Sequence, residues 1–170
     1  MAMYQTGDKV IYGMHGVCKI AAQEQRTMDG KQVTYLVLEP VGQTGSRFLV
    51  PTHNAAAMAK VRPVLSVESL EALLSSGSVR EDAWVRDEGQ RKQLYRELIS
   101  SCDRIRLAQM IYSLYRYRAA QAAAGKKFHM CDENFLRDAE KILAGEIAST
   151  LEIPSAEALK YLRNKLKEDA

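Results

Sequence analysis

The sequence predicts an α+β protein of two domains, a small antiparallel β-barrel followed by an all-α helical bundle. Up to residue 51, short apolar runs alternate with glycine turns, which is typical of β-strands. From residue 52 onward, apolar residues recur every three to four positions, which is typical of helices. A chain of 170 residues with 46% hydrophobic and 26% charged residues can form two small folded cores. We therefore expect domains at residues 1–60 and 61–170.

The first domain contains four or five predicted strands. We expect them at residues 9–12, 17–27, 32–39 and 47–50, with Asp29-Gly30 as a tight turn inside a hairpin. The stretch 32–39 carries apolar residues on both faces, so it should have neighbouring strands on both sides. Short antiparallel strands at this spacing commonly curl into a small barrel.

The second half of the chain contains the predicted helices. A short helix ending near Ala59, capped by Thr52 or Asn54, precedes an extended link at Pro63. Asp103 is placed to cap a helix with an apolar stripe. We expect helices at about 66–74, 81–100, 103–123, 132–147 and from 154 onward.

Positive charge is concentrated in the middle of the chain. Residues 1–83 carry 8 basic and 8 acidic side chains, residues 84–128 carry 10 and 4, and residues 129–170 carry 6 and 9. A local cationic excess attracts phosphate without reading sequence, so nucleic acid is a candidate partner. The other interpretation is a solvated helix face that is rich in lysine and arginine.

The sequence offers little support for catalysis, metal binding or a membrane location. Cys18, Cys102 and Cys131 are widely spaced, which indicates free thiols in a reducing compartment and hence the cytoplasm. His129 and Cys131 form the only close Cys/His pair, which is too little for a zinc site. Glu133, Glu140 and Glu146 have the spacing of a solvated helix face. We expect no enzyme activity and no cofactor, metal ion or membrane partner.

The only tryptophan, Trp84, stands in a hydrophilic stretch at the predicted start of the helix 81–100. One interpretation is that it packs between the two domains or against the bundle. The other is that it inserts at a base step of DNA while nearby cations hold phosphates. The basic residues that follow at suitable spacing are Arg86, Arg91 and Lys92.

A second group of aromatic and basic residues lies near the end of the helix 103–123. Tyr115 continues the apolar stripe and is assigned to the core, whereas Tyr112 and Tyr117 are candidates for the surface. The basic residues of this group, which we assign to phosphate contacts, are Arg116, Arg118, Lys126 and Lys127.

The chain resembles the CarD/CdnL family of bacterial transcription regulators. The family's opening strand pair, shared with transcription-repair coupling factor, is similar to Gly7-Asp8-Lys9-Val10-Ile11-Tyr12-Gly13-Met14-His15-Gly16-Val17. The similarity continues in the family's order through Tyr35-Leu36-Val37-Leu38-Glu39, Leu49-Val50-Pro51, Asn54-Ala55, Trp84, Ser101-Cys102-Asp103, Asp132-Glu133 and Lys141-Ile142-Leu143-Ala144-Gly145-Glu146.

The resemblance implies a fold and two partners. The barrel would be Tudor-like and bind the β subunit of RNA polymerase through Arg26, Thr27 and Met28. A second contact position falls on Leu49, with Arg47 two residues earlier. Trp84 would contact promoter DNA in the minor groove without sequence specificity, and so stabilise the open complex during initiation. Such a protein would be a monomer associated with the nucleoid through polymerase.

Two other classes remain open. A nucleic-acid-binding or protein adaptor with such a barrel would act away from promoters, but residues 1–83 carry no net charge, which favours a protein partner for the barrel. An enzyme with an unrecognised site is the other class.

Overall fold

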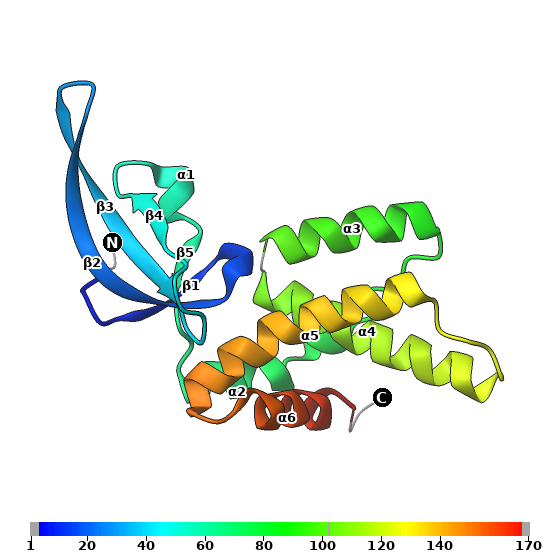
Figure 1. Cartoon of the computed structure of the whole chain (residues 1–170). Helices are drawn as coiled ribbons and strands as arrows, with labels where there is room; N and C mark the ends of the chain where they lie inside the picture. Colours follow the sequence, from blue (N-terminus) through cyan, green and yellow to red (C-terminus); the bar gives the residue numbers. More distant parts are fainter. Residues whose placement is uncertain (1–3, 102, 168–170) are drawn as a thin grey trace. The chain divides into compact units, whose positions relative to one another are not determined.

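The structure, a computed structural model, describes residues 4–101 and 103–167 (Figure 1). Its contacts divide the chain into two compact units, residues 1–64 and residues 65–170. The first is called the sheet unit and the second the helical unit. Residues 61–63, which the sequence assigned to the helical domain, pair as a strand in the sheet unit.

The sheet unit is one antiparallel sheet with the strand order β4-β3-β2-β1-β5. Its elements are β1 (Lys9–Tyr12), η1 (Gly13–His15), β2 (Val17–Met28), β3 (Lys31–Pro40), β4 (Phe48–Pro51), α1 (Ala55–Met58) and β5 (Val61–Pro63). The paired ends of β2 and β3 form a long hairpin that extends past β4 (Figure 1). Asp29 and Gly30 turn this hairpin with positive φ angles of 49° and 77°, as the Asp-Gly pair predicts.

The core of the sheet unit lies mainly against one face of the sheet. Leu36 and Leu38 of β3 pack there in a cluster with Val10, Cys18, Ile20, Val50 and Val61. Val37 on the opposite face of β3 is also buried. As the two-faced apolar pattern predicts, β3 has a neighbouring strand on each side.

The predicted small β-barrel takes the form of an open antiparallel sheet and is not closed. In the described part of the chain, β4 pairs only with β3, and β5 pairs only with β1. Closure requires the two edge strands to pair along their length. The edge strands are only four and three residues long, and Pro63 in β5 lacks the N–H that a ladder needs.

The helical unit contains the elements α2 (Val67–Ser75), η2 (Gly77–Arg80), α3 (Glu88–Ser101), α4 (Arg104–Ala123), α5 (Met130–Leu151) and α6 (Ser155–Lys167). The expected caps are present, since Ser66 and Asp103 accept hydrogen bonds from the backbone N–H groups of Ser69 and Arg106. The helix predicted at 81–100 begins only at Glu88, so Trp84 lies in an irregular segment before α3.

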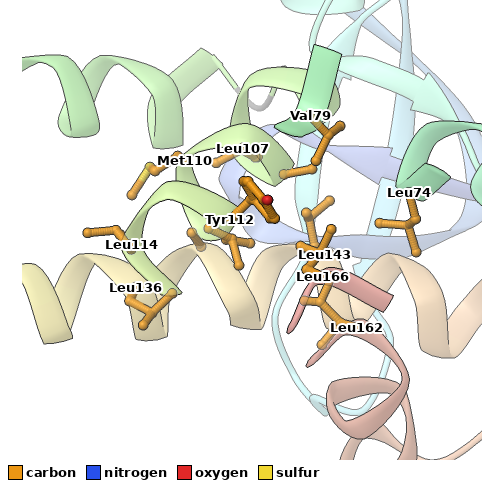
Figure 2. Close-up of a cluster of buried hydrophobic side chains, with 14 of the residues drawn as sticks. Leu74, Val79, Leu107, Met110, Tyr112, Leu114, Leu136, Leu143, Leu162 and Leu166 are labelled. Atoms are coloured by element: carbon orange, nitrogen blue, oxygen red, sulfur yellow. The ribbon is translucent and has the colours of Figure 1, made fainter. Parts of the chain in front are cut away.

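The core of the helical unit draws on every helix, with α4 in its centre. Figure 2 shows Leu107, Met110, Tyr112 and Leu114 of α4 among side chains of the neighbouring elements. Leu136 and Leu143 come from α5, and Leu162 and Leu166 come from α6. The apolar stripes read from the sequence therefore face this core.

Two glutamates predicted on a solvated face are buried instead. Glu140 is bound to Arg163 at 3.0 Å, and Glu146 is bound to Arg104 at 2.6 Å. Both carboxylates are charged groups that tolerate burial because an arginine neutralises them. Periodicity alone does not reveal such pairs.

The two cysteines that the structure describes are free thiols. Cys18 is a buried free thiol and Cys131 is a partly exposed one, while Cys102 lies outside the described residues. Within residues 4–101 and 103–167, no group of three or more His, Cys, Asp or Glu side chains is arranged to hold a metal ion. None of the helices in those ranges is long and apolar enough to cross a membrane.

Candidate functional site

The predicted polymerase contacts of the hairpin lie at its tip. Arg26, Thr27 and Met28 are the last residues of β2, and all three are exposed. Met28 leaves 54% of its surface in contact with solvent, which is high for a large apolar side chain. Arg26 forms a salt bridge of 3.0 Å with Glu24, two residues earlier on the same face. The tip thus combines an apolar group with an exposed cation.

The other two predicted contacts lie at the edge strand β4. Leu49 is opposite Val37 of β3 and remains 40% exposed. Arg47 just precedes β4 and binds Glu39 of β3 at 3.0 Å. No strand of the described chain covers the outer edge of β4, and such an edge can accept a strand from a partner. The five predicted residues therefore lie on two accessible features of one sheet.

Two hydrogen bonds hold the backbone of the segment that carries Trp84. The backbone N–H of Trp84 donates to the Asp82 carboxylate at 3.0 Å, and the N–H of Ala83 donates to the Ser113 hydroxyl at 3.1 Å. Ser113 belongs to α4 and is buried. These bonds attach an irregular segment to the core of the helical unit.

The indole of Trp84 is enclosed between two planar groups. The Tyr117 ring stacks on it with a centroid distance of 3.6 Å and an interplanar angle of 15°. The guanidinium carbon of Arg91 lies 4.3 Å from the indole centre. The two groups cannot lie on the same face of the indole, because non-bonded carbons stay about 3.5–4.0 Å apart and the groups would then overlap. They therefore cover opposite faces, and the part of the indole left for a partner is its edge.

Arg91, predicted to contact DNA, is buried and only 3% exposed. Its Nε and Nη2 donate to the two carboxylate oxygens of Asp132, each at 2.9 Å. Its Nη1 donates to the carbonyl oxygens of Val85 and Arg86 at 3.0 and 3.3 Å. Since these bonds occupy the guanidinium inside the protein, we correct its assignment from a phosphate contact to a structural residue.

A pocket of about 210 Å³ opens beside the indole. Trp84, Tyr117 and Tyr112 supply its aromatic lining, and Asp82 and Arg116 supply charge of opposite signs; Ser113 and Ala120 complete it. An aromatic surface with one cation and one carboxylate in its lining can accept a planar, partly polar group such as an exposed base edge.

The other predicted DNA contacts are more accessible than Arg91. Arg86, Arg116, Lys126 and Lys127 are exposed, and no ion pair involves them among the described residues. Lys92 pairs with Glu88 at 2.6 Å, and Arg118 pairs with Glu133 at 3.5 Å. Pairs of this exposed kind are weak and can be exchanged for phosphate.

Two tyrosines near this site belong to the core. Tyr115 is buried, as its place in the apolar stripe predicts, and its hydroxyl donates to Glu140 at 2.5 Å. Burial and this hydrogen bond raise the pKa of Tyr115. Tyr112, predicted on the surface, is buried too, because α4 is covered on most of its sides.

Sequence reasoning missed Asp132 and Tyr117 as supports of Trp84. Asp132 was assigned only to a helix start, but it lies four positions before Leu136 on the buried face of α5. An ionisable residue in register with an apolar stripe indicates a buried partner, so the signal was present. The stacking of Tyr117 on Trp84 has no comparable signal in the sequence.

The two units present different accessible features: the sheet unit has an exposed edge and hairpin tip, and the helical unit has a fixed indole beside exposed cations. Residues 4–64, nearly the whole sheet unit, match the family model of the CarD-like/TRCF RID domain. Residues 4–64 thus form a domain of the CarD-like/TRCF RID type, which agrees with the resemblance seen in the sequence. The helical unit lies outside the match.

Proposed function

We propose that the protein binds the β subunit of RNA polymerase through the sheet unit and contacts promoter DNA through the helical unit, thereby stabilising the open complex. The observation that carries the proposal is the CarD-like/TRCF RID match over residues 4–64, combined with a separate unit that presents a fixed indole. One chain would then hold polymerase and DNA at the same time. This function needs no catalysis.

Support for the polymerase contact comes from the geometry of the sheet unit. The uncovered edge of β4 can extend its sheet with a strand of the β subunit, and Leu49 can pack beside that strand. Arg26 is positioned to exchange its weak pair with Glu24 for an acidic group of the partner. Met28 offers apolar surface at the same tip.

Support for the DNA contact comes from the surroundings of Trp84. The indole edge can contact the edge of a base from the minor groove, beside a duplex that is already kinked or opened. Arg86, Arg116, Lys126 and Lys127 can neutralise phosphates around it. These contacts carry no sequence code, so the protein would act wherever polymerase has separated the strands.

The alternative is an adaptor that binds protein or nucleic acid away from promoters. The cations of the helical unit would serve it equally well, because phosphate attraction does not distinguish promoters from other nucleic acid. Residues 1–83 are electrically neutral, which argues against nucleic acid as the partner of the sheet unit. We therefore favour the promoter function.

The experiment is footprinting of a polymerase–promoter complex with and without the protein, together with co-purification of core polymerase without DNA. The proposal expects co-purification without DNA and new protection at the upstream edge of the opened region. Binding to polymerase without any change in the footprint would favour the adaptor. No affinity for polymerase would refute the proposal as a whole.

A further inference from the structure

Trp84 depends on a buried ion pair that joins three parts of the helical unit. Arg91 lies in the first turns of α3, Asp132 lies in the first turn of α5, and both side chains are almost completely buried. The carboxylate receives two parallel hydrogen bonds, the strongest form of an arginine–carboxylate pair. The pair therefore fixes the starts of α3 and α5 relative to each other.

The same guanidinium holds the segment that carries Trp84. Its Nη1 binds the carbonyl oxygens of Val85 and Arg86, the two residues that follow the indole in the chain. Its flat face covers the indole at 4.3 Å, opposite to the Tyr117 ring. A lysine could supply the charge but not this planar set of donors.

The charge state of Arg91 is secure despite its burial. Burial acts to lower the pKa of Arg91, but the hydrogen bonds and negative charge of Asp132 outweigh it and raise that pKa. A desolvated cation over an aromatic face is attracted more strongly than one in water. Arg91 therefore stays charged and covers one face of the indole.

We infer that Arg91 and Asp132 are positioning residues for Trp84: they fix the indole edge for DNA without touching DNA themselves. The inference rests on the proposed DNA contact only for its functional consequence. An indole edge that contacts bases should be held rigidly, because a freely rotating indole would lose conformational freedom on binding. The indole geometry itself can be measured without polymerase or DNA.

The test uses Trp84 as its own reporter, since it is the only tryptophan in the chain. We compare wild type with Arg91→Lys and Asp132→Asn by tryptophan emission, near-ultraviolet circular dichroism and acrylamide quenching. We expect red-shifted emission, a weaker near-ultraviolet signal and stronger quenching in both variants. In the polymerase–promoter complex, the gain in open-complex lifetime that these variants give should fall about tenfold, toward that of Trp84→Ala.

Arg104→Lys is the matched control, because Arg104 also binds a buried carboxylate, Glu146 at 2.6 Å, and is the first residue of α4, 13 positions before Tyr117. It should lower thermal stability while leaving the tryptophan signals unchanged. If the single variants at the pair do not fold, the double variant Arg91→Met with Asp132→Leu replaces the pair by apolar groups, which buried ion pairs commonly tolerate. It should show the same loosened indole.

The outcomes separate the two claims. Folded variants of the pair with wild-type emission, quenching and near-ultraviolet signal would overturn the positioning role. Changed tryptophan signals equal to those of Arg104→Lys would overturn it as well, because the effect would then be general loosening. If the signals change as expected but Trp84→Ala has no effect on the open complex, the positioning role stands and the proposed DNA function fails.

Discussion

The helical unit buries several ion pairs besides its surface pairs, whereas the ion pairs described in the sheet unit lie on the surface. In the sheet unit, the salt bridges Arg26–Glu24 and Arg47–Glu39 lie on the surface, with side chains 39–65% exposed. In the helical unit, Asp132, Glu140 and Glu146 are buried and each is bound to an arginine. Surface pairs contribute little to stability and can be exchanged for a partner, whereas buried pairs fix the shape of a unit. The difference suits a docking surface on one unit and a rigid contact on the other.

The largest effect on stability should follow from breaking a buried pair. Arg104→Ala leaves the Glu146 carboxylate without this cation and should reduce the free energy of unfolding of the helical unit by about 3–5 kcal/mol. The matched change in the sheet unit, Arg26→Ala, should cost less than about 1 kcal/mol. Urea titration of both variants measures the difference. Equal costs would show that the contrast between the units has no energetic meaning.

Charge reversal at the hairpin tip should act on binding rather than on stability. Arg26→Glu creates like charges with Glu24 and with an acidic partner, and such contacts cost several kcal/mol, so polymerase affinity should fall about 100-fold or more. The melting temperature should stay nearly unchanged because the side chain is exposed. Co-purification with the β subunit and a thermal melt provide the two measurements. Retained binding would remove Arg26 from the docking surface.

High pH should weaken the sheet unit before the helical unit. Burial raises the pKa of the Cys18 thiol to about 11, against about 9 in the unfolded chain. Between these values the unfolded chain binds fewer protons, so stability falls as pH rises, by up to about 1.4 kcal/mol per pH unit. Burial also raises the pKa values of Tyr95 and Tyr115 in the helical unit. The loss of stability that they cause begins only near pH 10, where tyrosines of the unfolded chain start to ionise. Nuclear magnetic resonance signals of each unit, followed from pH 8 to 11, would reveal the order; simultaneous loss would contradict it.

The smallest effect concerns the reactivity of that thiol at neutral pH. Cys18 is buried and protonated, and thiols react as thiolates, so alkylation should spare it in the folded protein. The partly exposed Cys131 of the helical unit should react first. Peptide mapping after a short exposure to iodoacetamide distinguishes the two sites. Prompt modification of Cys18 would show that the core of the sheet unit opens readily.

The sequence predicted most of the elements but not whether the sheet closes into a barrel. The Asp29-Gly30 turn, the caps Ser66 and Asp103, and the stripe of α4 follow from local rules. The closed barrel does not follow, because pairing between distant edge strands depends on their length and on Pro63 rather than on any local pattern. Local signals describe an element, and closure is a property of the whole sheet.

The candidate site was predicted by composition and corrected by burial. The cationic excess in residues 84–128 includes exposed basic residues such as Arg86 and Lys126, and their contact with phosphate stays a prediction. Arg91 was misread, although it lies four positions before Tyr95 and seven before Leu98, on the buried face of α3. A charged residue in register with an apolar stripe should be paired with one on a neighbouring helix, here Asp132, before it is assigned to a ligand.

The central claim is that a fixed indole on the helical unit holds separated promoter strands while the sheet unit holds polymerase. The most direct measurement is the lifetime of the open complex on a promoter template with wild type and with Trp84→Ala, at concentrations where both occupy polymerase equally. The claim predicts that wild type prolongs this lifetime and that Trp84→Ala loses most of the gain. An equally long lifetime with Trp84→Ala would contradict it.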